Sequence, residues 1–182
     1  MSKTLVFFFH ERFESSQANR SMIKALSTLD NIEIVNMHQI FTENGNKFDS
    51  NSDIQRLLNA DRIIFQFPIQ WYSMPAFMKQ WIDETFTRMY YIRYGEEGLK
   101  MEGKKFMISV TAGNFEEAYT PQGQNLIPLD DLLNPLKALA HRCKLQWSEP
   151  FISYRANKKS VEELEETAEQ YRQFVSKWME KY

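Results

Sequence analysis

The sequence predicts an α/β protein built on a parallel sheet with helices on both faces. Three observations support this prediction. Apolar runs of the kind found in strands buried on both sides occur at 4–9, 62–67 and 105–111. Amphipathic segments alternate with these runs along the chain. The length of 182 residues, with 43% hydrophobic and 25% charged residues, fits a single domain that spans residues 1–182.

The first half of the chain alternates strands and helices. In order, the patterns predict a strand at 4–9, a helix at about 16–29, a strand at 32–37, a short helix at 53–59, a strand at 62–67 and a helix that begins near Pro75 and runs to about Thr87. Proline suits the first turn of a helix because an N–H group there has no intrahelical partner in any case. The polar segment 42–53 is predicted to be a loop.

The second half continues the alternation. A strand is expected at 105–111, a helix at 129–142 and a short strand at 151–154. Ser160 and Glu163 form the Ser-x-x-Glu pattern of a capping box, which opens a last helix. Five strands alternating with five helices indicate a doubly wound sheet, in which ligands bind beyond the carboxyl ends of the strands. The loops at 10–19, 68–75 and 111–125 leave such ends.

Composition and charge argue against several classes of function. The formal net charge of −2 disfavours nucleic acid as the main partner, since phosphate binding needs an excess of Lys and Arg. No stretch approaches the ~20 apolar residues of a membrane span. The single cysteine, Cys143, cannot form an internal disulfide, so a cytoplasmic protein is expected. Neither His38 nor His141 has the spacing of a metal site, and no metal is assigned.

The loop at 10–19 lacks both glycine-rich phosphate motifs, Gly-x-Gly-x-x-Gly and Gly-x-x-x-x-Gly-Lys-Ser/Thr. It contains Ser15 and Ser16, which are candidate caps for the helix that follows. A helix start with hydroxyl groups and free backbone N–H groups can also bind an anion. Caps far outnumber phosphate sites, so this loop alone favours a plain cap, with His10 as a surface residue.

The loop at 68–75 places Trp71 and Tyr72 directly after a strand. A flat, partly apolar wall with backbone donors beside it suits a planar heteroaromatic ligand. Aromatic residues are also enriched where they line an interface between subunits. The residues alone leave the two interpretations open.

The loop at 111–125 begins with Thr111, Ala112, Gly113 and Asn114 and continues to Tyr119. Glycine allows a ligand to approach the backbone closely, while Thr and Asn supply short polar groups. The alternative is a plain turn from strand to loop. Together, the three loops predict a phosphate site, a planar wall and a polar rim at one edge of the sheet, which is a combination that suits flavin mononucleotide (FMN).

A long segment of the chain resembles the signature of the flavodoxin-like NAD(P)H:quinone oxidoreductases. It is Phe-Gln-Phe-Pro-Ile-Gln-Trp-Tyr-Ser-Met-Pro-Ala-Phe-Met-Lys-Gln-Trp-Ile-Asp, at 65–83. This family includes the mammalian quinone reductases and the bacterial flavoproteins ancillary to potassium-efflux systems. His10 with Ser16-x-x-Asn19, and 110–114 with Tyr119, support the resemblance. It implies a flavodoxin-like fold with a five-stranded parallel sheet in the order 2-1-3-4-5.

The resemblance also implies a non-covalent site for FMN, with FAD as the alternative. Carried over by position, the cofactor-binding residues are His10, Ser16, Ala18 and Asn19 at the phosphate, Pro68, Ile69, Gln70, Trp71 and Tyr72 along the isoalloxazine ring, and Thr111, Ala112, Gly113 and Asn114 at its other edge. Tyr119 matches a tyrosine near the flavin carbonyl, so it is both a cofactor-binding residue and the candidate catalytic residue. Asn125 stands where the larger mammalian members have a histidine that works with this tyrosine.

The activity that the resemblance implies is hydride transfer from NAD(P)H, through flavin N5, to a quinone or a similar acceptor. The alternative is a regulatory flavoprotein subunit of a membrane potassium-efflux system, with the transporter as its partner. The resemblance further implies a homodimer. In it, Tyr90, Tyr91 and Tyr94 form either a roof over the other subunit's pocket or a plain interface.

Overall fold

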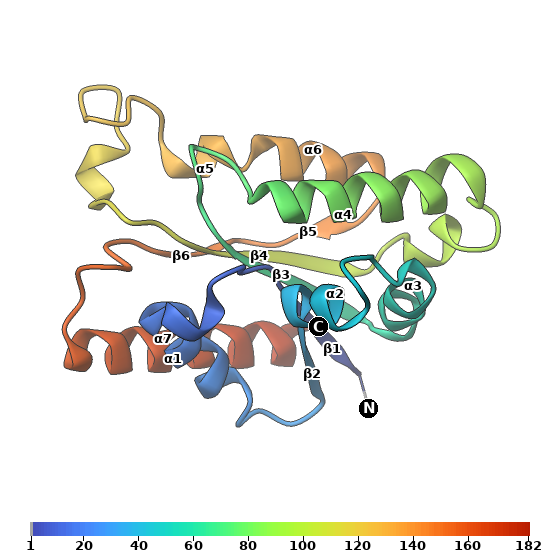
Figure 1. Ribbon diagram of the computed structural model, residues 1–182, viewed down its shortest axis with the longest axis horizontal. Helices are drawn as coiled ribbons and strands as arrows, with labels where there is room; N and C mark the ends of the chain where they lie inside the picture. Colours follow the sequence, from blue (N-terminus) through green and yellow to red (C-terminus); the bar gives the residue numbers. More distant parts are fainter. Residues whose placement is uncertain (1) are drawn as a thin grey trace.

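A parallel sheet lies between two layers of helices in the computed structural model, which describes residues 2–182 (Figure 1). The strand order is β2-β1-β3-β4-β5, and β6 also pairs with β4. The predicted order 2-1-3-4-5 is confirmed with β6 as the fifth strand, which was expected at 151–154, and β5 is an additional strand that the sequence did not predict. The strands are β1 (Thr4–Phe8), β2 (Ile32–Asn36), β3 (Arg62–Pro68), β4 (Lys105–Thr111), β5 (Gln146–Trp147) and β6 (Phe151–Ser153).

Burial follows the position of each strand in the sheet. Every residue of β1 is buried, and so are the first six residues of β3, because each strand has a neighbour on both sides and helices on both faces. The fifth position in the sheet is divided between β5, which pairs with the start of β4, and β6, which pairs with its end. Pro150 lies between the two short strands and has no N–H group to donate to the ladder.

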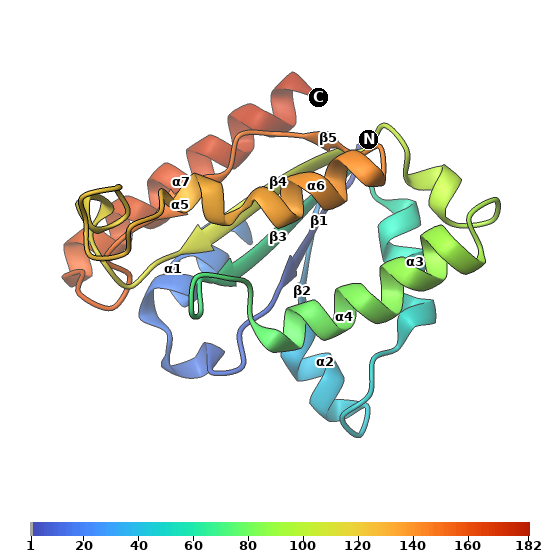
Figure 2. The same cartoon turned by 90° about the horizontal axis from the view of Figure 1, so that it is seen from above.

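The helices cover the sheet from both sides (Figure 2). On one face, α1 and α7 pack against each other over Val6, Ile64 and Met107. The other face holds the larger apolar cluster, to which α3, α4 and α6 contribute. The α-helices are α1 (Gln17–Leu26), α2 (Met37–Glu43), α3 (Ser50–Asn59), α4 (Ala76–Thr87), α5 (Leu129–Leu132), α6 (Asn134–Arg142) and α7 (Val161–Lys181), and the short helical turns are η1 (Phe13–Ser15), η2 (Arg88–Ile92), η3 (Gly98–Met101) and η4 (Glu116–Ala118).

Two predictions about helices were wrong. The segment after β2 contains α2, which begins where the strand was expected to continue and is capped by the side chain of Asn36. The helix expected at 129–142 is two helices, α5 and α6, that meet at Leu133. Pro135 explains the break, because a proline without an N–H group is accommodated only in the first turn of a helix.

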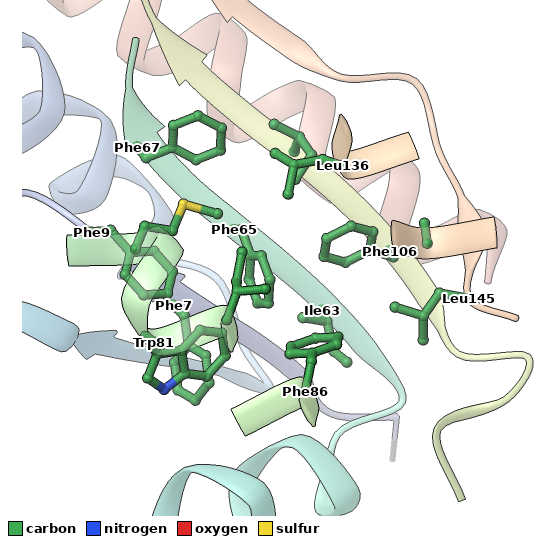
Figure 3. Packing of buried hydrophobic residues seen from close by; sticks show 14 of the residues in the cluster. Phe7, Phe9, Ile63, Phe65, Phe67, Trp81, Phe86, Phe106, Leu136 and Leu145 are labelled. Atoms are coloured by element: carbon green, nitrogen blue, oxygen red, sulfur yellow. The ribbon is translucent and has the colours of Figure 1, made fainter. Parts of the chain in front are cut away.

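Most of the aromatic side chains serve the core rather than a site. Trp81 of α4 is fully buried and packs against Phe7, Phe9 and Phe65, with ring centroids 5.2 to 5.5 Å apart. Figure 3 shows these side chains gathered between α4 and the strands. The rings of Phe7 and Phe65 meet Trp81 nearly edge to face, which is a preferred geometry for aromatic pairs.

One carboxyl group is enclosed in this aromatic region. Asp53 of α3 is fully buried, and the indole N–H group of Trp81 donates a hydrogen bond to its Oδ2 atom over 2.9 Å. Arg56 lies 3.4 Å from its other oxygen. Burial nevertheless raises the pKa of Asp53 above the ordinary value of 3.8, because removing the carboxylate from water outweighs these two contacts.

Asp53→Asn should flatten the pH dependence of stability just above pH 3.8. The raised pKa means that the folded protein keeps this proton over a range in which the unfolded chain has lost it. The stabilising contribution is therefore fully present below pH 3.8 and is lost as the pH rises through the raised pKa. The amide oxygen of Asn still accepts from Trp81, so its hydrogen bond remains.

Urea unfolding of the wild type and of Asp53→Asn across this pH range gives the free energy of unfolding of each protein as a function of pH. Asp83→Asn serves as the control, because it removes a carboxyl group that is exposed on α4 and lies outside the core. Parallel profiles for the wild type and Asp53→Asn would contradict the account of Asp53.

Candidate functional site

A polar cavity of about 270 Å³ lies at the carboxyl edge of the sheet. Its walls come from the segments that follow β1, β3, β4 and β6 and from the start of α1. None of the residues in these walls is acidic, so an anion would meet hydrogen-bond donors without a carboxylate to repel it. They are His10, Arg12, Ser15, Ser16, Asn19, Pro68, Ile69, Gln70, Thr111, Gly113, Ala156 and Asn157.

Eight of the fourteen residues carried over by resemblance are among these walls. The other six lie outside them and are Ala18, Trp71, Tyr72, Ala112, Asn114 and Tyr119. The predicted site residues did not include Arg12, Ala156 or Asn157, and the last two of these follow β6. The topology contained the signal, because the fifth strand of a parallel sheet must end at the same edge as the other four.

The start of α1 combines a cap with free donors. The backbone N–H group of Asn19 donates to the Ser16 hydroxyl oxygen over 3.4 Å, which makes Ser16 the N-cap. Within residues 2–182, the backbone N–H groups of Gln17 and Ala18 have no acceptor. Free N–H groups at a helix start carry a partial positive charge. The cap and the anion site are thus compatible features of the same turn.

The buried Asn19 side chain ties this turn to the sheet. Its Nδ2 group donates to the hydroxyl oxygens of Ser16 and Thr111, each over 3.1 Å. Its Oδ1 atom accepts from Nε2 of Gln66 in β3, also over 3.1 Å. All the hydrogen-bonding groups of the Asn19 amide therefore find partners on α1, β3 and β4.

His10 contributes a neutral donor. The backbone N–H group of Arg12 donates to its Nδ1 atom over 3.1 Å, so the ring proton resides on Nε2. Burial lowers the pKa of His10 below 6.5, and Glu11 offsets only part of this effect. At neutral pH the imidazole is thus uncharged, with Nε2–H available to a ligand.

Trp71 and Tyr72 occupy the tip of a strained turn. Gln70 and Ser73 exchange two backbone hydrogen bonds of 2.9 and 3.0 Å, and the two residues between them have φ angles of 44° and 65°. This is a type I′ turn, for which Asn and Gly are the usual residues. Bulky side chains in the left-handed region cost about 1 kcal/mol each or more.

The strained turn leaves its tip free to interact. Trp71 is 93% exposed and Tyr72 is 47% exposed. In the described part of the chain, the backbone N–H groups of both residues lack an acceptor. The base of the turn is held firmly, since the N–H group of Ile69 donates to the Thr111 carbonyl over 2.8 Å. Such local strain is typical of functional sites.

The segments after β4 and β6 are joined by backbone hydrogen bonds. Ala112 donates to the Ser153 carbonyl over 2.8 Å, and Ala156 donates back to the Ala112 carbonyl over 2.9 Å. This pairing brings Asn157 beside Gly113, where a Cβ atom would lie 3.7 Å from Asn157 Nδ2. The Asn114 side chain turns away from the cavity and donates to Gln124.

Tyr119 faces a different cavity. It is buried, lies 5.8 Å from Tyr154 between ring centroids, and lines a cavity of about 670 Å³ that also borders Trp147. Burial raises the pKa of Tyr119, and the nearby Tyr72 raises it further. The phenol therefore keeps its proton at neutral pH, close to the strained turn but outside the polar cavity.

The interpretation of Tyr90 as a roof or interface residue was wrong. Its ring is buried and stacks on Phe86, and its hydroxyl group donates to the Cys143 carbonyl over 3.3 Å. Tyr91 and Tyr94 remain exposed. Cys143 is buried as expected, and burial raises the pKa of its thiol to about 11.

Residues 2–182 lack two other features that would indicate a function, a membrane-spanning helix and a metal-binding cluster. None of the helices within residues 2–182 has the length and apolar character needed to cross a membrane. The same residues contain no group of three or more His, Cys, Asp or Glu side chains placed to hold a metal ion.

Comparison with known proteins gives a consistent result. The family model for the flavodoxin-like fold matches residues 2–175. The chain is 34% identical over 169 residues to YdeQ of Bacillus subtilis, which is described as an uncharacterized NAD(P)H oxidoreductase. This match covers 93% of the chain and 84% of YdeQ.

Two further matches extend along nearly the whole chain. The first is KefG of Cronobacter sakazakii, a glutathione-regulated potassium-efflux system ancillary protein, which is 32% identical over 176 residues, covering 96% of this chain and 93% of KefG. The second is the crystal structure of general stress protein 14 of Treponema denticola in complex with FMN. It aligns with a TM-score of 0.84 over 96% of this chain and 98% of that chain, at 24% identity, and shows the likeness of fold.

Replacing Trp71 by Asn and Tyr72 by Gly should raise the free energy of unfolding by about 1 kcal/mol. Asn and Gly relieve the strain at both positions, about 2 kcal/mol together, and the greater freedom of Gly in the unfolded chain offsets about half of this gain. Both side chains are exposed, so little packing is lost. Trp71→Phe keeps a bulky residue at the tip and serves as the control, with unchanged stability. Urea unfolding gives the free energy of unfolding of the wild type, the double variant and the control. A double variant that is less stable than the wild type would contradict the assignment of strain.

Proposed function

The chain belongs to the family of proteins with the flavodoxin-like fold, and we propose that it is an FMN-dependent oxidoreductase that carries hydride from NAD(P)H to a quinone or a similar acceptor. The description of the relative YdeQ as an NAD(P)H oxidoreductase supports the reaction class. The FMN bound to general stress protein 14 of Treponema supports the choice of cofactor.

The observation that carries this proposal is the chemistry of the polar cavity. Its walls offer hydroxyl groups, the neutral Nε2–H donor of His10 and one guanidinium group, with no acidic side chain among them. The free N–H groups at the start of α1 add to this set. A donor set without carboxylates fits the phosphate group of FMN.

The strained turn fits the other end of the cofactor. We propose that Pro68 to Tyr72 line the isoalloxazine ring, with the unpaired N–H groups of Trp71 and Tyr72 directed at its polar edge. The segment 111–114 would hold the opposite edge. Hydride transfer is the chemistry that FMN supplies when bound, and donors fixed in this turn stabilise negative charge without having to reorganise.

Tyr119 is proposed as the catalytic residue. Its raised pKa keeps the phenol neutral, so it can donate a hydrogen bond to a group that gains negative charge during reduction. Asn125, whose backbone N–H donates to the Ala118 carbonyl, has an amide side chain that cannot pass on a proton. Tyr119 would therefore act without a histidine partner at that position.

A second candidate function follows from the likeness to KefG. The chain could act as an ancillary flavoprotein of a potassium-efflux transporter, with its reductase activity secondary. Co-purification with the candidate transporter, together with potassium efflux measured with and without the protein, tests this role. Efflux that does not change on addition of the protein would count against it.

Two further features belong to the proposal. We propose a homodimer, since Trp71, Tyr91 and Ile92 expose large apolar side chains that a second subunit could cover. A cytoplasmic location suits a reductase that draws on NAD(P)H.

The purified protein should bind FMN and oxidise NAD(P)H when a quinone is supplied. Heating releases a non-covalent chromophore, and its mass separates FMN from FAD. Stopped-flow reduction with NADH and NADPH then gives the preferred donor. A protein that takes up neither flavin would disprove the proposal, whereas one that binds FMN but reduces no quinone would point to another acceptor.

Tyr119→Phe should slow flavin reduction by roughly tenfold or more, because one hydrogen bond to developing charge is lost. The affinity for FMN should remain unchanged. Tyr154→Phe, at the ring facing Tyr119, is the matched control and should react at the wild-type rate. Equal rates of flavin reduction for the wild type, Tyr119→Phe and Tyr154→Phe would show that Tyr119 has no catalytic role.

A further inference from the structure

The cavity of about 670 Å³ that Tyr119 lines, called the second cavity from here on, differs in its chemistry from the polar cavity. Among the described residues, its walls contain three aromatic rings, three carboxyl groups and one basic side chain, that of Lys137. The two cavities have no residue in common, so the proposed phosphate site does not explain these groups. The rings belong to Tyr119, Trp147 and Tyr154, and the carboxyl groups belong to Glu116, Asp130 and Glu149.

Two of the carboxyl groups in the second cavity are unpaired. Lys137 pairs with Asp130, whose Oδ2 atom lies 2.6 Å from the lysine Nζ atom. Within residues 2–182, the side chains of Glu116 and Glu149 take part in no ion pair and no hydrogen bond. Burial raises the pKa of the Tyr154 phenol, and the charges of Glu116 and Asp130 raise it further, so these carboxylates lie close to its ring. The walls therefore attract a cation.

The aromatic rings of the second cavity also favour a cation. The face of a Trp or Tyr ring attracts a positive charge that lies within about 6 Å of its centre. One such contact is present in the cavity itself, because the Nζ atom of Lys137 lies 5.9 Å from the centre of the Trp147 ring. The rings of Tyr119 and Tyr154 lie 5.8 Å apart between centroids. In the described part of the chain, no cationic side chain lies over either of these two rings.

A polar group without a partner belongs to the same walls. Tyr119 is only 8% exposed, and its hydroxyl group forms no hydrogen bond within residues 2–182. This hydroxyl group is not enclosed, in contrast to the hydroxyl group of Tyr171, which is sealed in the core. A largely buried hydroxyl group is stabilised when a ligand or a water molecule supplies the missing partner. Its oxygen can accept a hydrogen bond from an ammonium group.

We propose that the second cavity binds an organic ammonium ion that carries an aromatic ring. The unpaired carboxylates of Glu116 and Glu149 attract the charge, and the rings of the walls supply faces for both the cation and the apolar part of the ligand. The cavity volume of about 670 Å³ suits a small organic molecule. This inference goes beyond the proposed function and does not rest on it, because the second cavity is separate from the one assigned to the phosphate group of FMN.

Three probes of similar size separate the effect of charge from that of shape. They are 2-phenylethylammonium, 2-phenylethanol and phenylacetate, which join the same ring to a cationic, a neutral and an anionic group. Labelling the protein with 5-fluorotryptophan gives four ¹⁹F NMR signals, and Trp147→Phe identifies the signal of Trp147. This signal should shift with 2-phenylethylammonium, whose dissociation constant should be roughly tenfold lower than that of 2-phenylethanol. Phenylacetate should leave the signal unchanged.

A double variant tests the two unpaired carboxylates. Glu116→Gln combined with Glu149→Gln keeps the shape of both side chains and removes their charge. It should weaken the binding of 2-phenylethylammonium roughly threefold to thirtyfold and leave that of 2-phenylethanol within about twofold of the wild type. The matched control combines Glu117→Gln with Asp131→Asn, which changes the net charge by the same amount at exposed residues that do not line the second cavity. The control should bind 2-phenylethylammonium as the wild type does.

Three results would overturn the inference. The first is a Trp147 signal that does not respond to 2-phenylethylammonium. The second is a response of equal strength to the neutral or the anionic probe, which would show that charge is not recognised. The third is an equal loss of affinity in the double variant and in its control, which would show only an effect of net charge. A protein that binds 2-phenylethylammonium as expected but takes up no FMN would disprove the proposed function and leave this inference in place.

Discussion

The side chain of Asn19 is the point at which the sheet and the candidate site are joined. Its hydrogen bonds reach the first turn of α1, the interior of β3 and the end of β4. These three segments are distant in sequence, and only the parallel arrangement of β1, β3 and β4 brings them together. The start of α1, the interior of β3 and the end of β4 are held at one edge of the cavity by this buried amide.

The apolar core restricts where chemistry can occur. Because helices cover both faces of the sheet, polar groups of the central strands become accessible only where those strands end. The aromatic residues divide accordingly. Phe7, Phe65 and Trp81 stabilise the interior, whereas Trp71 and Tyr72 are held outside it in an unfavourable backbone conformation. A turn that is strained and also rich in unpaired donors is suited to binding rather than to stability.

The sequence predicted the strands closely, because a run such as Thr4–Phe9 is apolar throughout and is bounded by polar residues. The ends of the predicted strands also located three of the loops that form the site, at 10–19, 68–75 and 111–125. It missed α2, whose start at Met37 continues the apolar pattern of the preceding strand. It also misplaced Tyr90, since η2 is a wider turn that departs from the 3.6-residue period used to judge which side chains face inward.

Other features of the site depend on long-range contacts that no local pattern encodes. Asn157 reaches the cavity only because the segments after β4 and β6 pair through their backbones. Likewise, Gln66 stands in an otherwise apolar run, and its link to Asn19 spans 47 positions of sequence. A buried polar residue in a strand suggests a function, but its partner becomes visible only in the folded chain.

The central claim is that the polar cavity holds the phosphate end of FMN among hydrogen-bond donors, with no acidic side chain in its walls. The ³¹P NMR signal of bound FMN tests this claim directly. A phosphate group enclosed by such donors should stay dianionic, so its chemical shift should remain constant through the region near pH 6 in which an exposed phosphomonoester titrates. A bound signal that follows the titration of free FMN would place the phosphate group in solvent and contradict the account.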